Sequence, residues 1–175
     1  MQPIAITQGD PAGIGPEIVA KAFRDAPDAL RHCFVVGDVA TVRRAAGVIT
    51  RPGVPGVPVA QIGAPGEAAD VPPRCIPVLQ LPGIPGPQPW GEISPAAGRA
   101  AADSVVWAAR AALRGEVAAL VTAPLHKEAL SAAGVDFPGH TELLQAEAAA
   151  HQGVSLAQMP VRMICLLYTS PSPRD

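Results

Sequence analysis

The sequence has few of the residues that mark several large classes of protein. Aromatic side chains make up only 3% of its 175 residues, while hydrophobic residues make up 49%, so Ala, Val, Leu and Ile must build the core. Such cores suit helices packed on a parallel sheet, whose central strands are apolar on both faces. The net charge is −2 and lysine occurs only as Lys21 and Lys127. This balance gives no reason to expect a nucleic acid or a membrane as partner.

Other absences concern the cell compartment. Cys33, Cys75 and Cys165 are odd in number and far apart, and they form neither a C-x-x-C pair nor a metal-ligand spacing. This usage favours a reducing compartment. No N-terminal segment has the pattern of a signal peptide, and no apolar run is long enough to span a bilayer. We therefore predict a cytoplasmic protein.

The C-terminal segment, CLLYTSPSPRD at residues 165–175, differs in composition from the Ala-rich chain before it. It can be back-translated into the sequence of a transposase-library sequencing adapter; the alternative is an ordinary Ser/Pro-rich tail. We therefore expect a non-native tail and exclude it from reasoning about the fold. The native part, residues 1–164, is then the N-terminal portion of a longer protein and ends within a strand-like run, PVRMI.

The preceding residues alternate between strand-like and helix-like patterns. Apolar runs predict buried strands at residues 4–7, 32–38 and 116–124. VPVAQI and CIPVLQL, in a Pro/Gly-rich stretch, predict edge strands because proline cannot donate to a central ladder. Helical periodicity covers residues 17–26, 39–47, 96–114, 125–134 and 142–153, with Ser94 and Thr141 as candidate caps. The order predicts an α/β sandwich with a mostly parallel sheet.

Three segments fall where a strand ends and a helix begins, which is where α/β sheets bind ligands. The first, GDPAGIGPE at residues 9–17, lacks the G-x-G-x-x-G spacing of a dinucleotide fingerprint. A tight structural turn would explain its glycines, whereas the functional alternative is a backbone open to a ligand at Gly13–Gly15. Asp38, which follows another strand, is interpreted as a turn residue because the fingerprint it should accompany is absent.

The other two segments carry cations and hydroxyls. Lys127 follows a strand end, and its ammonium could meet a phosphate or carboxylate, although a His-Lys pair on a helix is more often solvated surface. His140 and Thr141 precede an apolar helix. Either Thr141 caps that helix and His140 is incidental, or imidazole, hydroxyl and backbone N–H groups converge on an anionic substrate group.

Three motifs together resemble 4-hydroxythreonine-4-phosphate dehydrogenase: GDPAGIGPE, TAPLHKEAL at 122–130 and AGVDFPGHTELL at 133–144. FVVGD and the G-x-x-S-x-x-x-G pattern of Gly91, Ser94 and Gly98 agree with it. The resemblance covers residues 1–164, roughly the N-terminal half of a family member. It implies the two-lobed α/β fold of isocitrate and isopropylmalate dehydrogenases, which is distinct from the Rossmann domain.

The resemblance also implies a reaction in pyridoxal phosphate biosynthesis. NAD or NADP oxidises 4-phosphooxy-L-threonine to a 3-keto acid, which decarboxylates to 3-amino-2-oxopropyl phosphate. His140 and Thr141 match the family's substrate-binding pair, Lys127 lies near the same pocket, and Gly13, Ile14 and Gly15 line the cofactor side. A divalent metal (Zn, Mg or Co) acts as a Lewis acid in the family.

By the same resemblance, only some of the family's functional residues are present in this chain. The family's metal-binding histidines, and the lysine, asparagine and arginine that complete its substrate site, have no counterparts here, so we assign no metal ligand and no catalytic residue. The family forms homodimers with active sites at the interface. We therefore expect the full-length protein to be the enzyme and this chain to be inactive. Alternatives are oxidation of 4-phospho-threonate, 4-phospho-erythronate or a dihydrodiol carboxylate, or a noncatalytic phosphate- or nucleotide-binding fragment.

Overall fold

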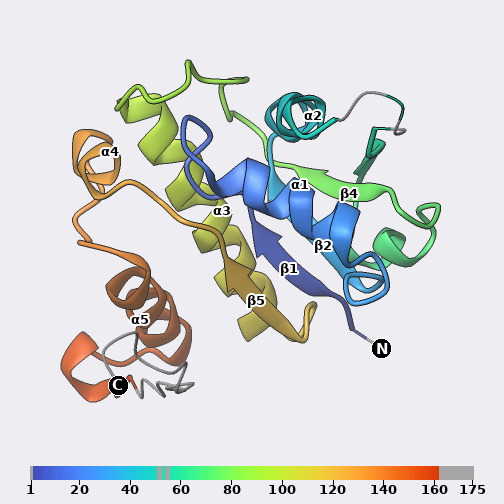
Figure 1. The fold of residues 1–175 in the computed structure, drawn as a ribbon. Coiled ribbons are helices and arrows are strands. Elements are labelled where there is room, and N and C mark those ends of the chain that lie inside the picture. Colours follow the sequence, from blue (N-terminus) through green and yellow to red (C-terminus); the bar gives the residue numbers. More distant parts are fainter. Residues whose placement is uncertain (1, 51–52, 54–55, 162–175) are drawn as a thin grey trace, which may run out of the picture.

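The computed structural model describes residues 2–50, 53 and 56–161 of the chain. The expected tail and most of the predicted strand at 160–164 lie outside these residues. Five strands form one sheet with only parallel pairings, in the order β3-β4-β2-β1-β5 (Figure 1). The strands are β1 (Ile4–Thr7), β2 (Cys33–Gly37), β3 (Val59–Ile62), β4 (Ile76–Gln80) and β5 (Ala119–Thr122). The predicted α/β fold with a parallel sheet is confirmed.

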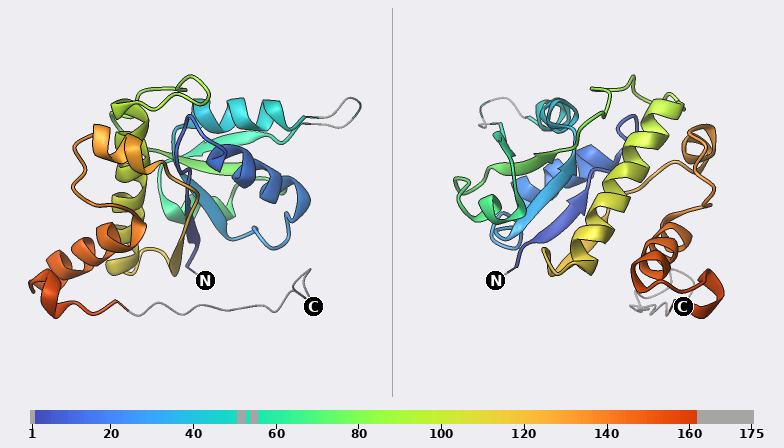
Figure 2. Two further views of the ribbon diagram at one scale, coloured as in Figure 1. Left: turned by 60° about the vertical axis from the view of Figure 1, so that its left-hand side comes forward. Right: turned by 180° about the vertical axis from the view of Figure 1, so that it is seen from behind.

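Helices enclose the sheet on both faces (Figures 1 and 2). They are α1 (Gly15–Asp25), α2 (Val39–Val48), α3 (Pro95–Leu113), α4 (Lys127–Ala132) and α5 (His140–Gln152), with short 3-10 helices at Pro65–Ala69 and Leu156–Gln158. Helices α1 and α2 bury Val19, Phe23 and Val42 against one face of the sheet. Helix α3 buries alanines against the other face, where Phe34 meets the Trp107 ring edge-on. None of the helices in the described residues has the length and apolar character needed to cross a membrane.

Helices α4 and α5 lie outside α3, as the view from behind shows (Figure 2). A Cβ added at Gly98 of α3 would lie 1.9 Å from the carbonyl oxygen of Ala129, so only glycine permits this approach of α4. Arg110 of α3 holds α5 through two hydrogen bonds to Glu147, of 2.7 and 3.1 Å. Together these contacts hold α4 and α5 against α3.

The path of the chain creates a switch point between β1 and β5. From β1 the chain crosses one face through α1 and α2 to reach β2 and β3, and it later returns over the other face through α3 to β5. Connections that leave neighbouring strands toward opposite faces open a crevice at the carboxyl ends of those strands, where α/β proteins bind ligands. The segments after β1 and β5 are two of the three predicted site segments.

The structure corrects the prediction that CIPVLQL forms an edge strand. Strand β4 lies inside the sheet, between β2 and β3. Pro77 is tolerated there because the ladder with β2 begins one residue later, at Val78, while the N–H of Ile76 donates to Pro58 on the β3 side (2.9 Å). The N–H that Pro77 lacks would face β2, where pairing begins only at Val78, so the ladder between β2 and β4 loses no hydrogen bond.

The prediction of a buried strand at residues 116–124 is also wrong. Strand β5 is shorter and lies at the edge of the described sheet, with β1 as its neighbour. None of its four residues is fully buried, and Val121 is 52% exposed. Burial against the described residues, 2–50, 53 and 56–161, therefore does not explain why the residues of β5 are apolar.

Candidate functional site

The glycine-rich loop after β1 packs directly on the end of β5. The N–H of Asp10 donates to the carbonyl of Pro124 (2.9 Å), and the N–H of Ala123 donates to the Thr7 hydroxyl (3.3 Å). The buried Gln8 side chain ties the same region to β2, since its Oε1 accepts from the N–H of Asp38 (2.8 Å). The carboxyl ends of β1, β2 and β5 therefore form one connected edge.

Two glycines of this loop are explained by packing within the protein. Gly9 has φ +71°, and a Cβ there would lie 2.4 Å from the oxygen of Pro124. A Cβ at Gly15 would lie 2.6 Å from the oxygen of Gln8. Gly13 is half-buried and Ile14 is 51% exposed, so they are the part of the predicted cofactor loop that a ligand can reach.

His140 lies on the same edge, beside Ala123. Burial lowers the pKa of His140, and a backbone hydrogen bond with Ala123 raises it. The net lowering keeps the imidazole neutral at physiological pH. Its Nε2 is buried and has no hydrogen-bond partner among the described residues. Buried polar atoms are rarely left unpaired, so this nitrogen is available for a ligand or a water molecule.

The helix N-termini separate into two groups. Asp38 caps α2 by accepting from the N–H of Thr41, and Ser94 caps α3 by accepting from that of Ala97, as predicted for Ser94. Helices α1, α4 and α5 have no side-chain cap. The prediction of Thr141 as a cap is wrong, because the helix begins two residues earlier than predicted, at His140, with Gly139 in the cap position. The free N–H groups and dipole of an uncapped helix favour an anion.

Lys127 is the first residue of α4, four residues after Ala123. It is exposed and makes no hydrogen bond or ion pair with the described residues. The glycine loop and His140 therefore share Ala123 as a common neighbour, and Lys127 begins the helix that follows this segment. No measured contact joins Lys127 to His140 or to Thr141.

Sequence reasoning missed Arg44, which ties a second loop to the glycine loop. From α2, its guanidinium donates to the carbonyls of Pro11 (2.8 Å) and Gln88 (2.5 Å). The Trp90 ring lies 3.8 Å from the guanidinium carbon, and the N–H of Gly91 donates to Ala12 (2.8 Å). Burial lowers the pKa of Arg44, and the charge of Asp38 raises it. No motif marks this arginine, because its partners are backbone carbonyls.

Arg44→Lys should destabilise the chain by about 1 kcal/mol, because an ammonium cannot donate to both carbonyls and keep its place over an indole ring. Urea unfolding would measure the change, and hydrogen exchange should become faster at residues 86–93 and 10–13. Arg43→Lys is the matched control, because the neighbouring Arg43 is exposed on the same helix. Equal effects of the two substitutions would contradict the role given to Arg44.

The described residues fit the expected cofactors unequally. Among residues 2–50, 53 and 56–161, no cluster of three His, Cys, Asp or Glu side chains could hold a metal ion. The divalent metal that the sequence resemblance implies therefore has no site among these residues, and no step is derived through it. For a nicotinamide cofactor, the reachable backbone at Gly13–Ile14, beside the uncapped α1, is compatible with a bound anionic group.

Comparison with known proteins points to one family. The family model of the pyridoxal phosphate biosynthetic protein PdxA matches residues 29–173. The 4-hydroxythreonine-4-phosphate dehydrogenase of Beijerinckia indica is 40% identical over 93% of this chain and 47% of its own length. The D-threonate 4-phosphate dehydrogenase of Salmonella typhimurium is 43% identical over 81% of this chain and 42% of its own length.

A solved structure agrees with these relatives. The 4-hydroxythreonine-4-phosphate dehydrogenase of Klebsiella pneumoniae superposes with a TM-score of 0.74 at 40% identity, over 84% of this chain and 44% of that one. The chain thus spans about half the length of the relatives it matches.

Proposed function

The chain belongs to the PdxA family, and from this premise we propose that the full-length protein oxidises 4-phosphooxy-L-threonine with NAD or NADP. The carbon that bears the 3-hydroxyl loses a hydride to the nicotinamide, and the hydroxyl loses its proton. The resulting 3-keto acid loses carbon dioxide to give 3-amino-2-oxopropyl phosphate. Residues outside this chain supply any metal ligands. The enzyme is a homodimer and works in the cytoplasm.

The observation that carries this proposal is the unpartnered Nε2 of His140 at the uncapped N-terminus of α5. In the proposed complex, His140 and Thr141 bind the substrate through the imidazole nitrogen, the hydroxyl and the free backbone N–H groups. A neutral imidazole can donate to, or accept from, a substrate hydroxyl without adding charge. The helix dipole and the unpaired ammonium of Lys127 favour the substrate's anionic groups.

The proposed cofactor side is the surface at Gly13, Ile14 and Gly15. Gly15 acts indirectly, because its missing side chain lets the loop lie against Gln8 and Pro124. Gly13 and Ile14 present backbone and an apolar side chain to the solvent beside the α1 N-terminus. When bound there, the nicotinamide would supply the hydride acceptor, and the loop would hold the cofactor near the His140 corner.

D-threonate 4-phosphate is the second candidate substrate, because relatives named for it match this chain as well as those named for 4-hydroxythreonine 4-phosphate. The two acids differ at carbon 2, which bears an amine in one and a hydroxyl in the other. Both carry the carboxylate and the phosphate that the uncapped helix and Lys127 would attract. The proposed anion site therefore serves either acid.

A spectrophotometric assay of the full-length protein tests the proposal. We expect NAD(P) reduction with 4-phosphooxy-L-threonine at a higher kcat/KM than with D-threonate 4-phosphate, and little with unphosphorylated 4-hydroxythreonine. The reverse order of the two phosphorylated acids would establish the second candidate. An enzyme that reduces no NAD(P) with either acid would refute both.

A further inference from the structure

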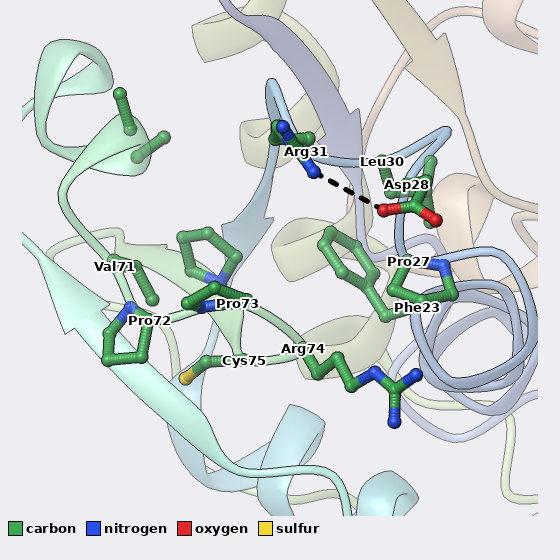
Figure 3. A pocket seen from close by; sticks show the side chains of 13 residues that line it. Phe23, Pro27, Asp28, Leu30, Arg31, Val71, Pro72, Pro73, Arg74 and Cys75 are labelled. Carbon is green, nitrogen blue, oxygen red and sulfur yellow. Dashed lines mark hydrogen bonds and ion pairs between the residues drawn. The ribbon is translucent and has the colours of Figure 1, made fainter.

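A cavity of about 370 Å³ lies at the opposite edge of the sheet from the candidate site (Figure 3). The loop between α1 and β2 forms one wall, and the segment that leads into β4 forms the other. Because Cys33 begins β2 and Ile76 begins β4, this cavity lies at the amino ends of the strands. We call it the amino-edge pocket. Its volume is in the range of small-molecule sites, and nothing in the proposed function uses it.

Part of the lining of the amino-edge pocket is apolar and stiff. Phe23 belongs to the hydrophobic core and is 3% exposed, and Leu30 packs against the same core cluster, whereas Val71 lies on the opposite wall (Figure 3). Four prolines complete the walls: Pro27, Pro72, Pro73 and Pro77. Proline fixes its own backbone φ, so these walls lose little conformational freedom when a ligand binds.

The polar groups of the pocket leave positive charge available. Arg74 has no hydrogen bond or ion pair with the described residues. Arg31 pairs with Asp28 at 3.4 Å, but the two side chains are 72% and 95% exposed, so water weakens this pair. Two arginines against one carboxylate make the rim attractive to an oxyanion, which a guanidinium binds with two parallel hydrogen bonds.

The backbone of Arg74 points to the same residue. Its φ is +64°, and it is the only non-glycine residue with a positive φ among the described residues. A side chain disfavours this conformation, which glycine adopts freely. A strained residue with an unpaired, exposed cation at the rim of a cavity suggests a function for the side chain.

We propose that the amino-edge pocket binds a small organic anion. This ligand carries either a carboxylate or a phosphate ester, together with an apolar group about the size of one aromatic ring. Arg74 holds the oxyanion, and Arg31 contributes when it exchanges Asp28 for the ligand. Phe23 and Leu30 contact the apolar group. This proposal does not depend on the activity at the other edge of the sheet.

Cys75 provides a reporter for this proposal, because it lines the pocket and is partly exposed. Iodoacetamide labelling of the chain, followed by mass spectrometry of the Cys75 peptide, measures occupancy. We expect benzoate or phenyl phosphate at millimolar concentration to slow the labelling of Cys75, and neutral benzyl alcohol or inorganic phosphate alone to slow it much less. Comparing benzoate with phenyl phosphate identifies the preferred oxyanion.

Variants of Arg74 test the assigned contact. Arg74→Gln should weaken protection by the better anion about tenfold, whereas Arg43→Gln, at an exposed arginine on α2, should not. Glycine adopts a positive φ freely, so Arg74→Gly keeps the fold while removing the cation. It should weaken protection as much as Arg74→Gln does. Protection that is absent, equal with benzyl alcohol, or unchanged in both Arg74 variants would overturn the proposal.

Discussion

Gly98→Ala should destabilise the chain by roughly 2–3 kcal/mol, although alanine is the better helix former. The added Cβ would lie 1.9 Å from the oxygen of Ala129 and 2.8 Å from the nitrogen of Leu130. Both are backbone atoms, so no side-chain rotation relieves the overlap and α4 must move away from α3. The shift would carry Lys127 with it, because Lys127 begins α4. Chemical denaturation followed by circular dichroism would measure the loss.

Gly47→Ala is the matched control for this prediction. Gly47 is also helical, in α2, but a Cβ there meets nothing within 4 Å. The substitution should therefore stabilise the chain by about 0.5–1 kcal/mol, the usual gain on replacing an exposed helical glycine. If both substitutions changed the free energy of unfolding in the same direction and by a similar amount, the close contact between α3 and α4 would not be what requires glycine at residue 98.

His140→Ala should lower kcat/KM of the full-length protein about 100-fold, or about 2.7 kcal/mol of transition-state stabilisation. His140 is the one partly buried histidine at the carboxyl ends of the strands, and its Nε2 lacks a partner among the described residues. Removing it leaves the substrate's polar group without a neutral partner at the α5 N-terminus. Initial rates of NAD(P) reduction with the preferred phosphorylated acid give the value.

The control for this substitution is His32→Ala, since His32 has an exposed side chain immediately before β2, at the amino end of that strand. It should leave kcat/KM within a factor of about two, as surface substitutions usually do. A His140→Ala enzyme that is folded, by circular dichroism, and as active as His32→Ala would remove His140 from the substrate site.

The order of strands and helices could be predicted because each pattern is local. Alternating apolar runs and helical periodicity depend on neighbouring residues, and the Ser94 cap follows from a hydroxyl before a proline. The position of β4 inside the sheet could not be predicted, because it depends on which strands pair across the fold. The exposure of β5 could not be predicted for the same reason, because an apolar strand has the same sequence pattern whether or not another segment covers it.

The candidate site was predictable in part. The segments after β1 and β5 carry recognisable motifs, and the structure brings both the glycine loop and His140 to Ala123. The reasons for Gly9 and Gly15 were hidden, because a motif does not show which backbone atoms lie close: Pro124, more than a hundred residues away, for Gly9, and Gln8 for Gly15. Arg44 and Arg74 were also hidden, because neither a backbone-carbonyl contact nor a positive φ leaves a motif.

The most direct test of the account is a crystal structure of the full-length protein with NAD and a slowly reacting analogue of the phosphorylated acid. The account predicts the acid at the carboxyl ends of β1 and β5, within hydrogen-bond distance of His140 Nε2 and Thr141, with the cofactor against Gly13 and Ile14. An acid bound where it touches neither His140 nor Thr141 would contradict it.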